Sequence, residues 1–188
     1  MKPFRRRRRG TVTATFQQNE ARLLANLAAQ VVELLRDRNG EAEAEPDPLA
    51  ALVGMTGPVE PPDDPVLARL LPDAYRDDPE EAGEFRRYTE QALTSLKVEN
   101  ARSVIDGLTA GGMQESGNGN VEVELDEGAV MAWLRALTDI RIALAVRLGI
   151  ESDEDAEHLA DSEDEAQTAM LDVYDWLGFV QETLVQVA

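Results

Sequence analysis

The sequence predicts a mainly α-helical protein, a compact helical bundle with a small two-stranded antiparallel β ribbon. Long stretches repeat apolar residues at helical spacing, proline and glycine mark their ends, and two short stretches alternate as strands do. The 188 residues suit one domain, and a hydrophobic content of 43% is sufficient for a core. We expect residues 1–10 to form a flexible basic arm and residues 11–188 to form a single helical domain.

The most apolar long stretch, Glu127–Leu148, predicts a helix at the centre of the bundle. Apolar residues surround most of it, as is typical of a helix that neighbours cover on most sides. Arg141 falls within the apolar stripe, where an unpaired guanidinium would be costly. We therefore predict a buried, structural ion pair between Arg141 and either Asp175 or Asp172 on the last helix. A ligand-binding role for these charges is the alternative.

Capping signals place the other helices. An amphipathic helix is expected over Gln18–Arg38, ended by Asn39-Gly40. Aspartate followed by proline opens short helices over 49–53 and 66–71, because aspartate caps the free N–H groups and proline suits the first position.

The same signal at Asp78-Pro79 opens a long helix that runs to about Leu108, and the last helix covers about 163–187. The apolar pattern assigns these residues to the buried side of the long helix: Phe85, Thr89, Ala92, Leu93, Leu96 and Val104.

Two alternating stretches, Thr11–Phe16 and Val121–Leu125, predict strands. An isolated strand cannot satisfy its backbone hydrogen bonds, so we expect the two to pair. Residues 110–120 are rich in glycine and predict a linker. They lack the Gly-Lys-Ser/Thr sequence of a phosphate-binding loop.

Charge is distributed unevenly along the chain. The net charge is −19, yet residues 1–10 carry +6, so the remaining 178 residues carry −25. Nine of the fifteen residues 151–165 are acidic, which predicts a solvated acidic loop. A body of this charge repels nucleic acid and anionic membranes and attracts basic proteins.

The basic arm is the candidate for contact with phosphate groups. Its arginines are consecutive: Arg5, Arg6, Arg7, Arg8 and Arg9. Such a run can bind nucleic acid, but it can also lie back on the acidic body as a solvated arm.

Several classes of function lack the residues that they need. The chain has no cysteine and a single histidine, His158, so disulfides, thiolate zinc sites and a cysteine nucleophile are excluded. We predict no catalytic residue, no metal and no cofactor, and therefore no enzyme. No apolar run approaches the length of a membrane span, and no apolar segment follows the basic start as in a signal peptide, so we expect a cytoplasmic protein without a membrane partner.

Three stretches together resemble a known family. They are DPVLARLLPDAYRDDPEEAGEFRRYTE (64–90), AWLRALTDIRIALAVRLGI (132–150) and VYDWLGFVQETLV (173–185). The chain is similar over nearly its whole length to an actinomycete domain-of-unknown-function family that is encoded near the Clp protease adaptor and includes oxidative-stress regulators. The resemblance implies a cytoplasmic regulator that senses oxidants through cysteines and contacts an alternative sigma factor. This sequence departs from that pattern because it has no cysteine.

We therefore expect a non-catalytic regulatory interaction protein that acts in transcription or in the stress response. Its partner would be a sigma factor or another basic protein, which the acidic body attracts. The alternatives are a nucleic-acid-binding protein that uses the arginine arm and an accessory factor of Clp proteolysis. The sequence leaves the oligomeric state open, with a homodimer among the options.

Overall fold

The computed structural model describes residues 1–7, 10–42, 57–75 and 77–188. Within these ranges it contains six helices and three strands, which confirms the mainly helical fold class. The helices are α1 (Gln18–Ala42), α3 (Pro65–Leu70), α4 (Pro79–Ala110), α5 (Glu127–Leu148), α6 (Asp153–Ala160) and α7 (Glu165–Val185). The strands are β1 (Lys2–Arg6), β2 (Val12–Gln17) and β3 (Asn120–Leu125).

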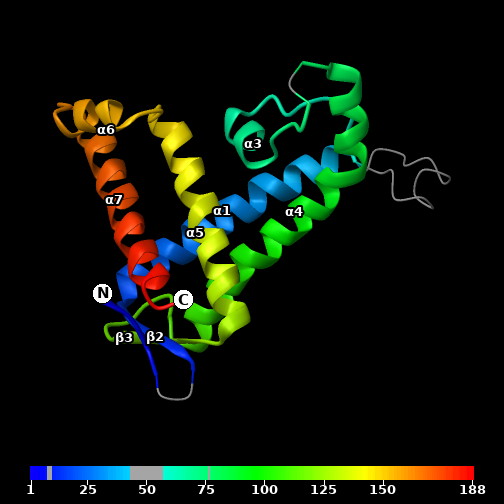
Figure 1. Cartoon of the computed structure of the whole chain (residues 1–188). Helices are drawn as coiled ribbons and strands as arrows, with labels where there is room; N and C mark the ends of the chain where they lie inside the picture. Colours follow the sequence, from blue (N-terminus) through cyan, green and yellow to red (C-terminus); the bar gives the residue numbers. More distant parts are fainter. Residues whose placement is uncertain (8–9, 43–56, 76) are drawn as a thin grey trace.

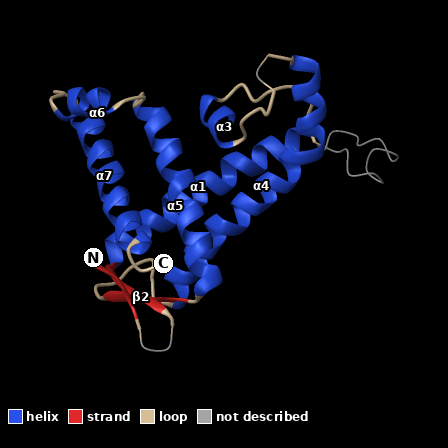
Figure 2. Ribbon diagram, viewed as in Figure 1, coloured by secondary structure: helices blue, strands red, loops and turns tan. Residues whose placement is uncertain are grey.

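The helices form two limbs that diverge from the sheet (Figure 1). In one limb α5 and α7 pack together as a hairpin, with α6 at its far end. In the other limb α1 packs along α4, and α3 packs against α5 on the side that faces this limb. Helices and strands are therefore segregated, with the sheet at the base of both limbs (Figure 2). The predicted compact bundle is wrong only in part: α5 packs against α4 as well as α7, whereas α6 and α7 diverge from α1 and α4.

The sheet has three antiparallel strands in the order β1-β2-β3. The predicted pair of strands is present as β2 and β3, with Ala14 opposite Val123. The prediction of only two strands is wrong, because residues 2–6 of the expected flexible arm form β1 along β2. Phe4 explains the difference: it is 3% exposed and anchors β1, although charged residues surround it in the sequence.

Three aromatic rings join the sheet to the helices. Phe4 lies 6.1 Å from Phe16 and 6.0 Å from Trp133 between ring centroids, and both pairs meet edge to face. The indole N–H of Trp133 donates a hydrogen bond to the carbonyl of Ser103 on α4, at 3.2 Å. The cluster therefore connects β1, β2, α4 and α5 in one packed core.

The predicted central helix α5 is buried over only part of its length. Its first half contributes Trp133, Leu137 and Ile140 to the core, whereas residues 141–146 are all half-buried. The helix ends at Gly149, whose φ of 72° is the left-handed conformation that favours glycine at a helix C-terminus. The second half of α5 thus lies at the margin of the core, where its apolar side chains pack against buried residues.

The buried side of α4 differs from the predicted one. Val104 is buried as expected, but Phe85 and Leu96 are 37% and 43% exposed. The first half of α4 instead buries polar side chains, among them Arg86 and Glu90. The apolar pattern fails here because paired charges occupy the interior.

The remaining boundaries need smaller corrections. Helix α6 forms inside the predicted acidic loop, where Ser152 and Asp155 make a reciprocal capping box. The backbone N–H groups of Glu151 and Ser152 and the Ser152 hydroxyl donate to Asp155, which lowers the pKa of this carboxyl.

Helix α1 continues to Ala42, past the predicted stop. The helix expected over 49–53 lies outside the described residues. No helix in the described ranges has the length and apolar character that crossing a membrane requires.

Gly107 tests the packing of the aromatic core. A Cβ atom at this position would lie 3.0 Å from Cζ2 of Trp133, which is fully buried and cannot retreat. We expect Gly107→Ala to destabilise the protein by about 1 kcal/mol, because overpacking of about 1 to 3 kcal/mol exceeds the helix-propensity gain of about 1 kcal/mol. Urea denaturation measures the change.

Gly128→Ala is the matched control. It lies in the first turn of α5, and a Cβ atom there meets only the Asp126 carboxylate at 3.5 Å. We expect it to leave stability unchanged or raise it slightly. Equal stability changes for the two variants would contradict the packing described for Trp133.

Candidate interaction surfaces

The outer face of the sheet carries the basic residues of the predicted arm. Lys2, Arg5 and Arg7 line a hollow of about 680 Å³ on this face, together with Glu122 and Glu124 of β3. The Nε of Arg7 donates to the hydroxyl of Thr13 at 3.1 Å, and the Thr11 hydroxyl donates to Glu124 at 2.8 Å. The three cations therefore share the face with two carboxylates.

The arginine run does not form a single surface. Arg6 points away from the outer face and donates from its Nε to the carbonyl of Val187 near the end of α7, at 3.1 Å. Arg8 and Arg9 lie outside the described residues. The binding of phosphate by Arg5 to Arg9 stays a prediction.

Arg141 is held differently from the way the sequence predicts. Its Nη1 donates to Oε1 of Gln181 at 2.8 Å, and its guanidinium lies 4.9 Å from the ring centroid of Tyr174. Within the described residues Arg141 makes no ion pair with Asp172 or Asp175, which are both exposed. Helical spacing explains the correction.

Tyr174, Gly178 and Gln181 share the face of α7 that meets α5, whereas Asp172 and Asp175 face outward. Arg141 is also only half-buried, and it is held by its hydrogen bond to Gln181 and by stacking on Tyr174, although its buried Nε has no hydrogen-bond partner in the described residues. The cluster is consistent with a structural role.

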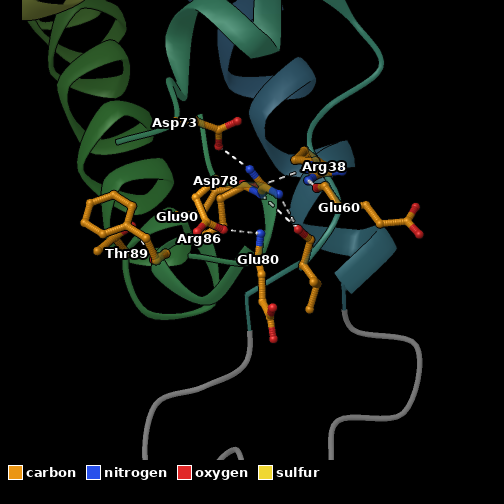
Figure 3. A network of polar contacts seen from close by, with 10 residues as sticks. Arg38, Glu60, Asp73, Asp78, Glu80, Arg86, Thr89 and Glu90 are labelled. Atoms are coloured by element: carbon orange, nitrogen blue, oxygen red, sulfur yellow. Dashed lines mark hydrogen bonds and ion pairs between the residues drawn. The ribbon is translucent and has the colours of Figure 1, made fainter. Parts of the chain in front are cut away.

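A second group of charges is buried between α1, α4 and the connector that precedes α3 (residues 57–64). Arg38 donates from Nε to Oε1 of Glu90 at 2.9 Å, and both side chains are buried. Arg86 pairs with Asp73 and donates from Nε to the carbonyl of Val59 at 3.0 Å. Figure 3 shows the two guanidinium groups between these partners.

This network fastens the connector to α1 and α4. Gly57 also packs closely against α4: an added Cβ atom would lie 2.8 Å from the carbonyl oxygen of Arg86, so the position requires glycine. The sequence gives little sign of the network, because its residues are far apart along the chain and periodicity does not distinguish them from surface charges. The Asp64 and Asp78 caps confirm the helix starts on either side of it.

A third buried pair joins α4 to α5. Nζ of Lys97 lies 2.6 Å from Oδ1 of Asp139, whose side chain is 7% exposed. Burial raises the pKa of Asp139, and the hydrogen bond and charge of Lys97 oppose that rise without cancelling it. Desolvation of the Asp139 carboxylate therefore lowers the stability that the ion pair contributes to the fold.

The far end of the α5–α7 limb holds unpaired negative charge. Residues 149–188 contain twelve acidic residues and no lysine or arginine. Seven exposed side chains on and beside α6 have no hydrogen bond or ion pair within the described residues: Glu151, Asp153, Glu154, Glu157, Asp161, Glu163 and Glu165. We call these seven residues the acidic end.

The arrangement defines a class of protein: a mainly helical, acidic protein whose interior charges are held by partners while its outer carboxylates face solvent. Among the described residues, no group of three or more histidine, aspartate or glutamate side chains is placed to hold a metal ion. The chain belongs to the family described as Domain of unknown function (DUF2017), whose model matches residues 1–188. This confirms the family resemblance of the sequence.

Named relatives come from mycobacteria. The protein called "Oxidative stress regulator AosR" in Mycobacterium tuberculosis (strain ATCC 25618 / H37Rv) is 36% identical over 178 residues, which cover 90% of this chain and 78% of that protein. The "Putative oxidative stress regulator AosR" of Mycobacterium leprae (strain TN) is 29% identical over 181 residues, covering 89% of this chain and 77% of that protein. No solved structure matches the chain.

Glu90 tests the buried network. We expect Glu90→Ala to destabilise the protein by about 3 kcal/mol, because it removes one member of a buried ion pair and leaves the Arg38 guanidinium without that carboxylate. Urea denaturation gives the free energy of unfolding. Glu84→Ala, an exposed change on the same helix, should stay within about 0.5 kcal/mol of the parent. A loss at Glu90 as small as the control's would show that the pair contributes nothing.

The Lys97–Asp139 pair predicts a dependence of stability on pH. Because the pKa of Asp139 is raised by folding, the folded state binds this proton more tightly than the unfolded chain does. The resulting stability is present below the unfolded pKa, about 4, and is lost as pH rises through the higher folded pKa. Asp139→Asn removes this titration, so the variant should gain stability relative to the parent between pH 4 and pH 7.

Thermal unfolding of both proteins across that range measures the difference. Asp106→Asn, at an exposed position on α4, should show no such trend. If the parent instead gained on Asp139→Asn as pH rises, the raised pKa would be refuted.

Proposed function

We propose that the chain is a non-catalytic regulatory protein that acts by binding a basic protein partner, a sigma factor being the leading candidate. The observation that carries the proposal is the acidic end, with its seven carboxylates free of protein partners in the described residues. Carboxylates that face solvent without internal partners are available to a basic partner at no cost to the fold.

Electrostatic reasoning supports a basic partner. A surface of one sign steers an oppositely charged protein into encounter and repels wrong partners of its own sign. The acidic end lies at the far end of a limb, away from the basic outer face of the sheet (Figure 1). A partner can thus approach it without meeting the cations of β1.

The relatives support a regulatory role. Two mycobacterial relatives that align over most of this chain have names containing "oxidative stress regulator". Buried charges often belong to active sites, but here they join elements of the fold. Arg86 contacts Val59 and Asp73, and Lys97 contacts Asp139. A cytoplasmic location accords with the proposed partner.

Two alternatives are weaker. Nucleic-acid binding would use Lys2, Arg5 and Arg7, but Glu122 and Glu124 share their face and its phenylalanines, Phe4 and Phe16, point into the core. Without exposed rings the face has no stacking platform for bases. A role as an accessory factor of Clp proteolysis rests on gene neighbourhood alone.

The test is affinity purification from a native extract with the full chain as bait, followed by mass spectrometry. We expect a sigma factor or another basic protein to be recovered at about 50 mM NaCl and lost at about 0.5 M, where screening is strong. The triple variant Glu154→Gln/Glu157→Gln/Asp161→Asn should weaken the captured interaction about tenfold, at about 0.5 kcal/mol for each of the three exposed pairs.

The matched control removes three exposed charges from α4 instead: Glu84→Gln/Glu99→Gln/Asp106→Asn. It should bind as the parent does within about twofold. Recovery of no basic protein at low salt would refute the proposed function, and equal weakening by both variants would show that net charge alone, not the acidic end, attracts the partner.

A further inference from the structure

The space between the two limbs contains an apolar groove whose walls come from α1, α3 and α5. It has a volume of about 300 Å³. Its apolar lining comprises Leu27, Val31, Leu34, Val66, Ile140, Ala143 and Leu144. Four of these side chains, Leu27, Leu34, Ala143 and Leu144, are only half-buried, so the groove is open to a partner.

The unpaired charges that line the groove are negative. Arg147 lines it but is paired with Asp64 at 3.0 Å, which neutralises the cation. Glu33 and Asp37 line it from α1, and within the described residues neither carboxylate has a hydrogen bond or ion pair. The groove therefore presents an apolar floor with a negative edge.

The spacing of the two carboxylates points to an external cation. Glu33 and Asp37 are four residues apart on one helix, so they are neighbours on its surface, and like charges at this spacing destabilise a helix. A lysine or arginine placed between them would remove that repulsion. The one cation that lines the groove in the described residues, Arg147, is paired with Asp64 instead.

We propose that this groove is the docking site for an amphipathic basic helix of the partner protein. The inference rests on the proposed function and names the element that the partner would present. Apolar side chains at helical spacing would fill the floor, while a lysine or arginine on the flank would meet Glu33 and Asp37. The volume lies at the lower end of the range for small-molecule sites, about 300 to 1,000 Å³, and suits a few side chains of a docked helix.

A second copy of this chain fits the groove less well. Each copy carries a net charge of −19, so two copies repel each other, and the negative edge would face further negative surface. A basic helix instead gains from both the floor and the edge.

The experiment uses the full chain and a designed peptide as the probe. The probe is a fluorescently labelled helix of about 18 residues with leucines along one face and lysines on the flanks. One comparison peptide replaces the lysines with glutamates, and another replaces the leucines with alanines. Fluorescence anisotropy measures affinity, and hydrogen–deuterium exchange measures which backbone segments the peptide protects.

We expect the leucine–lysine helix to bind and to protect residues 27–37 and 140–147, while both comparison peptides bind at least about tenfold more weakly. Glu33→Gln/Asp37→Asn should weaken binding about fivefold, as loss of two exposed ion pairs implies. Ala143→Phe, which fills the groove from α5, should weaken it by a similar factor or more. Glu154→Gln/Asp161→Asn removes the same charge from the acidic end and should change affinity less than twofold.

Three outcomes would overturn the inference. Protection of residues 151–165 in place of the groove would place the helix on the acidic end and leave the proposed function intact. Absence of binding, or binding that the Glu33/Asp37 and Ala143 variants do not weaken, would exclude the groove as the site. Concentration-dependent self-association of the protein alone, with protection of 27–37 and 140–147, would assign the groove to a second copy. Failure of the proposed function is a separate result, since it shows as absence of a basic partner in the affinity purification.

Discussion

The packing of Phe4, Phe16 and Trp133 is the constraint on which the rest of the fold depends. Phe4 brings the basic strand β1 onto the sheet, Phe16 contributes from β2, and Trp133 joins both to α5 while its indole N–H bonds to α4. Because the aromatic core lies at the base of the molecule, both limbs are anchored there and diverge beyond it (Figure 1). The groove lies beside the half-buried second half of α5, where that helix meets α1 and α3.

Charge is divided between two uses in this molecule. Inside, Arg38, Arg86 and Lys97 are each held by a carboxylate, and removal of the partner would leave Arg38, Glu90, Arg86 or Asp139 buried without it. Outside, carboxylates at the acidic end and along the groove have no protein partner in the described residues. The first set fixes how the helices and the connector lie against each other. The second set is free to interact with other molecules, and its strength depends on ionic strength.

The sequence predicts well where local chemistry decides and poorly where tertiary contacts do. The caps Asp64 and Asp78 are confirmed because their bonds to the following N–H groups are local. The predicted buried face of α4 is wrong because Arg86 and Glu90 are buried against partners that are distant in the sequence. The spacing of apolar residues along α4 does not indicate such partners. The predicted partner of Arg141, Asp175 or Asp172, is wrong. These residues and Gln181 all lie on α7, but only Gln181 lies on the face of α7 that meets α5. Strand β1 was missed because a single buried phenylalanine outweighs the charges around it.

The lack of cysteine bears on how such a protein can be controlled. A disulfide requires two thiols, so this chain cannot respond to oxidants through thiol–disulfide exchange. If it binds a basic partner as proposed, that binding is set by charge and apolar contact, both of which persist in oxidising and reducing conditions. Under that proposal, the carboxylates of the acidic end and the groove would bind a partner without any thiol-dependent step.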